Sequence, residues 1–360
     1  MSRKRFRWSR RPAGFGINSA IVLFITILVG VMWNVVSAVV RAEREETIQA
    51  AIDRNENLVI AFEQYTVRTL QDADTVTRYL VRESVDGSRK VDLVQFMTDY
   101  SVASKVIIGV ALADELGNGM TTAYSGEFAK PLNIADREHF QAHIGRDSAR
   151  MFVGKPVVGR VSGQGLVPVT RRINKPDGTF GGVAVALIEP ARFTDVLQDA
   201  KLRQHDVISL VGLDGITRAR LSGTVASWGE DISKSRLLAE QVQRPNGNFF
   251  GKGGRDGVPR YFSYRTLPDY QVIAIVGAAE ADVMAEFHRM QSQYYWLAGL
   301  TSVFIAGFVY ADAGPGQPAA RNRGRCPQRV AIQADGGKCR RSVLSSRCGR
   351  QAHAVRQSGL

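Results

Sequence analysis

The stretch from Asp136 to Glu189 combines cationic and aromatic side chains with three apolar, β-rich runs. The last two runs flank Lys175-Pro176-Asp177-Gly178, a turn sequence in which Pro presets φ and Gly accepts φ > 0. The runs are residues 151–159, 166–174 and 181–189, and the accompanying side chains are Arg137, Phe140, Phe152, Lys155, Arg171 and Arg172. Cations beside an apolar sheet can hold a small anionic ligand, so the stretch predicts a pocket. The alternative is a sheet whose open face carries ordinary solvated charges.

Catalytic motifs are absent from the sequence. Neither G-x-S-x-G, H-E-x-x-H nor G-x-x-x-x-G-K occurs, and Gly251-Lys252-Gly253-Gly254 lacks the phosphate-loop spacing and predicts a hairpin. His139 and His143 lie at i, i+4, a spacing that can bind metal on a helix, but no third ligand accompanies them. We therefore interpret them as surface histidines and expect no catalytic residue, no metal and no other cofactor.

Positive charge is concentrated at the two ends of the 360-residue chain, whose net charge is +13. Residues 1–11 contain six Lys/Arg and no acid, and residues 312–360 contain ten Lys/Arg and two Asp, which leaves residues 12–311 at −1. A nucleic-acid-binding protein would carry its basic patch on the folded domain, so no nucleic-acid partner is expected. All three cysteines (Cys326, Cys339 and Cys348) follow the second apolar segment, so no disulfide framework is expected before them.

Two apolar segments predict membrane-spanning helices. Residues 17–40 carry no charge and are long enough to cross a hydrocarbon core of about 30 Å. The basic residues 1–16 place the N-terminus in the cytoplasm. A cleaved signal peptide ending near Val36-Ser37-Ala38 is the alternative, against which the length of the apolar run argues. Residues 294–311 predict the second span, with an aromatic belt at Tyr294-Tyr295-Trp296.

Residues 41–90 predict a stalk helix that continues the first span. No Gly or Pro interrupts Arg41 to Ser84, and apolar or small residues recur mostly three or four apart from Ile48 to Leu80. Such a helix can form a dimer seam, or it can pack along the chain's own sheets, and we expect both in part.

Two sheet modules follow the stalk, over residues 91–201 and 202–278, and residues 279–293 predict a linker helix to the second span. Strand–turn–strand patterns recur with a nearly constant offset, as in Asp114 and Asp214 or Glu189 and Glu280. We therefore predict an α+β fold with two tandem antiparallel-sheet modules, each with helices on one side.

The segment 312–360 differs from the rest in having no apolar period and every cysteine. We expect that a frameshift in a GC-rich gene has replaced a cytoplasmic domain with out-of-frame sequence. The alternative is a disordered basic tail that lies on anionic lipid headgroups. Reading the other two frames downstream would decide between the two.

The layout of residues 41–293 resembles the double Cache (PAS-like, PDC-type) sensor region of bacterial membrane receptors. The segments that carry the resemblance are ADREHFQAH, FVGKPVVGRVSGQGLVPVTRRINKPDGTFGGVAVALI and VISLVGLDGITRAR. It implies a two-pass protein of the bacterial inner membrane, of the diguanylate cyclase or histidine kinase type, with residues 41–293 outside and the output domain missing. The implied partners are a small-molecule ligand, the lipid bilayer and a second copy that pairs through the stalk and spans.

In such receptors the membrane-distal module usually holds the ligand. The matching ligand-binding positions here are Tyr124, Arg137, Phe140, Lys155, Thr170 and Arg171. The family's amino-acid-sensing signature places a Trp-Tyr pair after the Arg, and this chain has His139-Phe140 instead. The expected ligand is therefore a small anion or carboxylate. The alternative is a membrane-anchored dimerisation module that binds no ligand.

Overall fold

A computed structural model describes most of the chain, and both sheet modules belong to one compact unit, Met1–Val309. The described residues are 15–85, 93–103, 106–124, 127–128, 132–145, 150–160, 162–195 and 202–312. The predictions for residues 1–14 and for the tail beyond Asp312 lie outside them.

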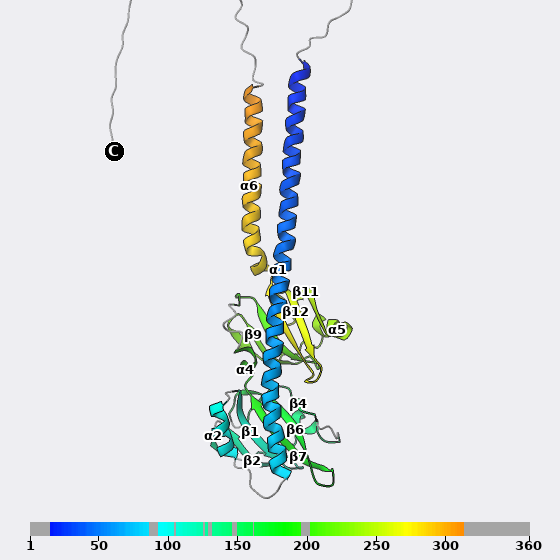
Figure 1. The fold of residues 1–360 in the computed structure, drawn as a ribbon, viewed down its shortest axis with the longest axis vertical. Coiled ribbons are helices and arrows are strands. Elements are labelled where there is room, and N and C mark those ends of the chain that lie inside the picture. The colour runs from blue at the N-terminus through cyan, green and yellow to red at the C-terminus, as the bar shows by residue number, and fades with distance from the viewer. Residues whose placement is uncertain are drawn as a thin grey trace, which may run out of the picture. The chain divides into compact units, whose positions relative to one another are not determined.

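The predicted first span and stalk are one continuous helix, α1 (Phe15–Val85). Its side chains Phe62, Leu70 and Leu80 are fully buried against strands of both sheets, and α1 runs along both sheets in Figure 1. The apolar row of the stalk therefore packs on the chain's own sheets. A dimer seam on α1 stays a prediction.

The two sheets have the same strand order, and all their strand pairs are antiparallel. The first runs β3-β2-β1-β7-β6-β4, with β5 paired to β6, and the second runs β10-β9-β8-β13-β12-β11. The predicted internal repeat and the α+β fold class are confirmed. The strands of the first sheet are β1 (Ile107–Ala113), β2 (Gly119–Tyr124), β3 (Glu127–Phe128), β4 (Phe152–Val153), β5 (Val157–Val158), β6 (Gly165–Asn174) and β7 (Phe180–Ile188). Those of the second are β8 (Val207–Gly212), β9 (Thr217–Ser222), β10 (Val225–Ser227), β11 (Asn246–Lys252), β12 (Pro259–Leu267) and β13 (Val272–Ala279).

The repeat extends to its turns. The carboxylate of Asp114 accepts a hydrogen bond from the N–H of Leu116 (3.0 Å), and Asp214 accepts one in the same way from Ile216 (3.0 Å). Gly215, in the second of these turns, has φ +80°, and a Cβ there would lie 2.4 Å from the Cα of Ser233. Gly215 is thus required by a positive φ and by a close backbone approach, and Asp214 caps the turn through its carboxylate.

Some predicted elements differ in the structure. The β-rich run 151–159 holds two short strands, β4 and β5, and Pro156 between them lacks the N–H that a continuous ladder would use. The linker helix 279–293 and the second span are one helix, α6 (Glu280–Asp312). The sequence did not predict β3, β10 or α5, and it indicated β11 only through the hairpin at Gly251-Lys252-Gly253-Gly254. The remaining helices are α2 (Leu93–Ala103), α3 (Glu138–Gln141), α4 (Ala191–Thr194) and α5 (Arg236–Gln243).

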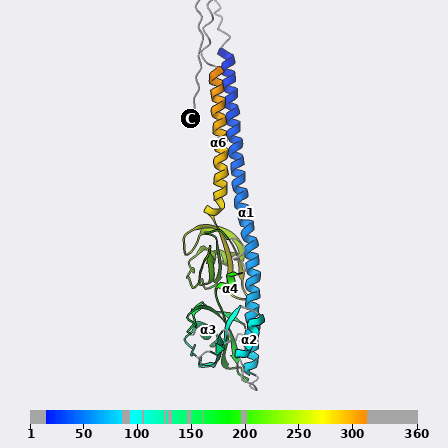
Figure 2. The ribbon, with the colours of Figure 1, turned by 90° about the vertical axis from the view of Figure 1, so that its left-hand side faces the viewer.

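Helices α1 and α6 are each long and apolar enough to cross a bilayer. They lie side by side in both views (Figures 1 and 2). Between them, the rings of Trp33 and Tyr295 stack with centroids 6.1 Å apart. The indole N–H of Trp33 also donates to the hydroxyl of Ser302 at 3.1 Å. Ser302 lies on α6 in a row of small residues spaced four apart, Ala298, Ser302 and Ala306, which lets another helix approach closely, and the helix that approaches Ser302 is α1 of the same chain.

Candidate functional site

The first sheet forms one wall of a cavity of about 110 Å³. Strands β1 and β7 supply that wall, and the segments 132–139 and 157–160 close it together with Ser162. Twelve of the described lining residues are apolar or Gly: Ala111, Leu112, Ala113, Gly119, Leu132, Ile134, Val157, Val158, Gly159, Leu166, Val185 and Leu187. The other four are Arg137, His139, Arg160 and Ser162. The site therefore presents a hydrophobic interior with a few polar groups, which is the usual composition of a small-molecule pocket.

Arg137 is the cation of this cavity that keeps most of its hydrogen-bonding capacity. It lies at the N-cap of α3 in an extended conformation. Its guanidinium donates to the carbonyl of Val158 at 3.5 Å, the upper limit for a hydrogen bond. Within the described part of the chain no ion pair includes Arg137. A guanidinium has five N–H donors, so it can still bind a carboxylate through two of them.

Arg160, the second cation, is already paired. It contacts the carboxylate of Asp136 at 2.6 Å and donates to the carbonyl of Asn133. The hydrogen bond from Arg160 lowers the pKa of the Asp136 carboxyl. The pair links the loop after β5 to the segment before α3, so Arg160 fixes the geometry around Arg137 more than it adds charge.

The two histidines are buried, and their assignment to the surface was wrong. His139 is 5 % exposed and His143 is 2 % exposed, because α3 and the turn that follows it lie against β6. Burial lowers the pKa of both imidazoles to about 4, helped by the nearby guanidinium of Arg137 for His139 and of Arg172 for His143. Both rings are therefore neutral at pH 7. No group of three or more metal-ligating side chains occurs among the described residues.

Thr170 sets the tautomer of His143, and the ring of His139 has one nitrogen without a partner among the described residues. The Thr170 hydroxyl donates its one proton to the carbonyl of His139 at 3.1 Å, so Nε2 of His143 must donate to that hydroxyl at 2.9 Å. Nδ1 of His139 is buried and has no hydrogen-bond partner among the described residues. Because His139 lines the cavity, a bound ligand is one partner that this nitrogen can take.

Of the residues predicted to bind ligand, the structure brings Arg137 to the cavity. Phe140 is 1 % exposed and packs edge-on against Phe180 at 5.5 Å, within the core. Lys155 pairs with Glu138 at 3.0 Å on the surface. Thr170 lies behind His139, as described above, and the side chain of Tyr124 on β2 lies outside the described residues.

Arg171 lies on the opposite face of the sheet, where its guanidinium pairs with Asp74 of α1. Its neighbour Arg172 points the other way, donates to the carbonyl of His143 at 2.6 Å and lies over the ring of Phe180. Adjacent residues of a strand alternate between faces, so one of this pair had to face α1. Sequence reasoning missed Arg160 and His139 as lining residues, since nothing in the local pattern connects the loop after β5 with α3.

Comparisons with known proteins agree with this architecture. No family model matches the chain, and no curated protein matches its sequence. Among solved structures, the extracellular domain of rpHK1S-Z16, described as a histidine kinase, superposes with a TM-score of 0.60 at 23 % identity, over 66 % of this chain and 98 % of that one. The extracellular domain of mmHK1S-Z3, described likewise, gives 0.51 at 12 % identity, over 68 % and 98 %.

A third neighbour is the sensory domain of the Campylobacter jejuni chemoreceptor Tlp3, solved with isoleucine bound. It superposes with a TM-score of 0.45 at 15 % identity, over 67 % of this chain and 97 % of that one, which is too distant to support an argument. The first two neighbours establish the fold: this chain has the long helix and two tandem antiparallel sheets of the extracellular domains of these kinases. The resemblance to a double Cache sensor region is confirmed at the level of fold.

Proposed function

We propose that residues 41–293 are the extracytoplasmic sensor of a two-pass membrane signalling protein, and that the cavity beside Arg137 binds a small carboxylic acid with a short apolar body. The observation that carries this proposal is the combination of a hydrophobic cavity with a guanidinium that has no ion pair among the described residues. The guanidinium fork matches a carboxylate through two parallel hydrogen bonds.

The volume of the cavity limits the size of the ligand. A water molecule needs roughly 10–15 Å³ of such a volume, so a cavity of about 110 Å³ accommodates about eight water-sized atoms. That corresponds to a carboxylic acid of five or six carbons. A hydroxyl next to the carboxylate would also satisfy Nδ1 of His139, because a hydroxyl can donate or accept as the tautomer requires. Leaving such a buried polar atom without a partner costs about 1–3 kcal/mol.

A 2-hydroxy acid fits better than the corresponding amino acid. An α-ammonium group needs a carboxylate or several carbonyl oxygens as acceptors, and none of the described lining residues is Asp or Glu. The absence of the family's Trp-Tyr pair after Arg137 supports the same preference. Signalling would then require that the ligand bind one arrangement of α1 and α6 better than another.

The test uses the full chain in nanodiscs of zwitterionic lipid. Its unfolding temperature is measured with 2-hydroxy-4-methylpentanoate, with leucine and with 4-methylpentanamide, which carries no charge. Because a ligand of the native state stabilises by RT ln(1 + [L]/Kd), a concentration of 100 Kd should add about 2.7 kcal/mol. The hydroxy acid should raise the unfolding temperature and the amide should not.

Two variants locate the site. Arg137→Gln should abolish the rise in unfolding temperature that the hydroxy acid causes. Lys155→Gln, the matched control, should retain that rise because Lys155 does not line the cavity. If both variants respond as the natural chain does, Arg137 does not bind the ligand. A panel of acids without any shift would favour the ligand-independent dimerisation module.

A further inference from the structure

The second sheet contains its own cavity, of about 50 Å³, in the equivalent place. Strands β8 and β13 line it through Ser209 and Ile275, just as β1 and β7 line the first cavity, and α5 closes it. The chemistry is different, because four cationic side chains line this cavity beside its apolar residues, against two in the first cavity. They are Arg220, Arg236, Lys252 and Arg260.

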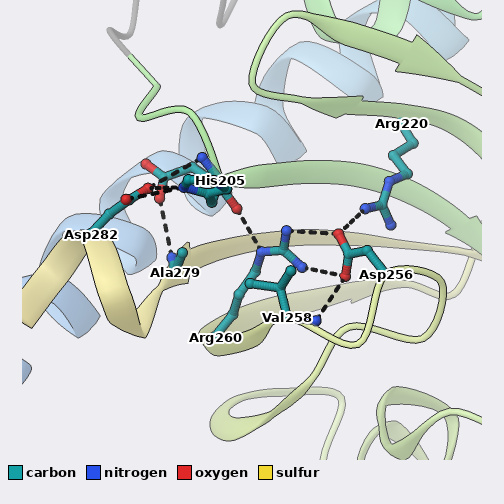
Figure 3. Close-up of polar contacts among 8 residues, drawn as sticks. His205, Arg220, Asp256, Val258, Arg260, Ala279 and Asp282 are labelled. Carbon is teal, nitrogen blue, oxygen red and sulfur yellow. Dashed lines mark hydrogen bonds and ion pairs between the residues drawn. The ribbon is translucent and has the colours of Figure 1, made fainter.

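The positive charge around this cavity is only partly neutralised. Asp256 binds Arg260 through two hydrogen bonds of 2.8 Å and Arg220 through one of 2.8 Å, as Figure 3 shows. Arg236 pairs with Glu240 at 2.8 Å. Among the described residues, Asp256 and Glu240 are thus the two carboxylates that pair with any of these four cations. A third, Glu230, also acts on Arg220 but is itself paired with Arg255 at 2.7 Å. Within the described residues no carboxylate lines the cavity itself.

Lys252 supplies one of the uncompensated charges, since no ion pair of the described part of the chain includes it. Burial lowers the pKa of Arg220, whose side chain is 10 % exposed, and Asp256 opposes that effect. An added negative charge would, like Asp256, stabilise the charged form of this desolvated guanidinium. The hydroxyl oxygen of Ser235 is also buried, and no described residue hydrogen-bonds to it.

We propose that this cavity binds a tetrahedral oxyanion dianion, a phosphate or sulfate group, as a second ligand site in the membrane-proximal module. At roughly 10–15 Å³ for each water-sized atom, about 50 Å³ accommodates about four such atoms, close to the size of this anion. The excess of two positive charges matches its charge, and Ser235 can donate to one of its oxygens.

The site is connected to α6 by a chain of hydrogen bonds. Arg260 donates through Nε to the carbonyl of His205 at 2.7 Å. The N–H of His205 donates to the carboxylate of Asp282 at 3.2 Å, and its ring nitrogen lies 3.1 Å from the same group. Figure 3 shows this chain of contacts from Arg220 to the first turn of α6. An anion that competes with Asp256 for Arg260 therefore acts on the group that holds His205 against α6.

In the binding test, the full chain in nanodiscs of zwitterionic lipid is titrated with phosphate or sulfate, and with chloride at equal ionic strength as the control. The heat of binding and the unfolding temperature are measured. Both dianions should bind and stabilise. Lys252→Gln should weaken phosphate binding about tenfold, the effect of one lost unit charge near a partly solvated anion. Arg244→Gln removes a charge from the opposite end of α5 and should change the affinity less than twofold.

Equal responses to dianions and chloride, or equal losses in the Lys252 and Arg244 variants, would overturn the proposal. Arg137→Gln should leave phosphate binding unchanged, so failure of the carboxylate site and failure of this one give different results.

Hydrogen exchange tests the connection to α6. Phosphate should change the exchange of the amides at residues 279–284, and Asp282→Asn should remove that change while phosphate still binds. An unchanged exchange pattern at saturating phosphate would show that the anion does not act on α6.

Discussion

Replacing Arg171 should separate its structural role from ligand binding. The sequence suggested Arg171 and Arg137 as equivalent ligand-binding cations, but the guanidinium of Arg171 pairs with Asp74 of α1 on the face of the sheet opposite the cavity. Arg171→Ala should therefore destabilise the fold and leave ligand binding intact. Arg137→Ala should abolish ligand binding and leave the stability of the fold unchanged.

The magnitude follows from the burial of the pair. The side chains of Arg171 and Asp74 are 11 % and 21 % exposed. Two unit charges 4 Å apart attract by about 4 kcal/mol at an effective dielectric constant of about 20, and desolvation offsets part of this. Exposed pairs contribute about 0–1 kcal/mol, and breaking a fully buried pair costs about 3–5 kcal/mol. We expect about 2 kcal/mol for this intermediate case, which lowers the unfolding temperature by about 4–8 °C.

The assay is thermal unfolding of the full chain in nanodiscs for Arg171→Ala, Asp74→Asn and the double variant, with and without 2-hydroxy-4-methylpentanoate. If the ion pair is the cause, the double variant should lose clearly less than the sum of the single losses. The reasoning would be refuted if Arg171→Ala left the unfolding temperature unchanged and abolished the response to the ligand.

Three further predictions concern stability. Phe62→Ala should cost about 3–5 kcal/mol, measured by denaturant unfolding, because the ring is fully buried between α1 and the sheets; a loss under 1 kcal/mol would contradict that packing. Gly215→Ala should destabilise more than Gly229→Ala, since both glycines have φ +80° but only Gly215 meets backbone atoms within 4 Å where a Cβ would lie; equal unfolding temperatures would show that the turn relaxes. Stability should fall between pH 6.5 and 4, because the folded state lowers the pKa of His139 and His143 from 6.5 to about 4 and so disfavours their protonation. Each histidine contributes up to about 3 kcal/mol by this shift, all of it present above pH 6.5, and a double Gln variant whose unfolding temperature kept the same pH dependence would contradict this assignment.

Local patterns in the sequence predicted much of the fold because they report short-range physics. The uncharged run of residues 17–40 is long enough to cross a bilayer core. The spacing of apolar residues in the stalk places them on one face of a helix. The Asp-Gly turn at Asp214 satisfies a positive φ that few other residues accept. These requirements act within a few residues of each other, so the sequence alone was sufficient for the two long helices, the Asp-Gly turn, the repeat and the α+β class.

The sites depended on which face each strand presents and on which distant loops meet, and only the tertiary structure decided that. Strand alternation separates Arg171 from Arg172 but does not say which faces α1. His139 was expected at the surface, yet α3 packs it against β6. The contact of Arg260 with His205 joins residues 55 apart, and that of His205 with Asp282 joins residues 77 apart. Such contacts depend on how the helix and the sheets pack, which no window of neighbouring residues encodes.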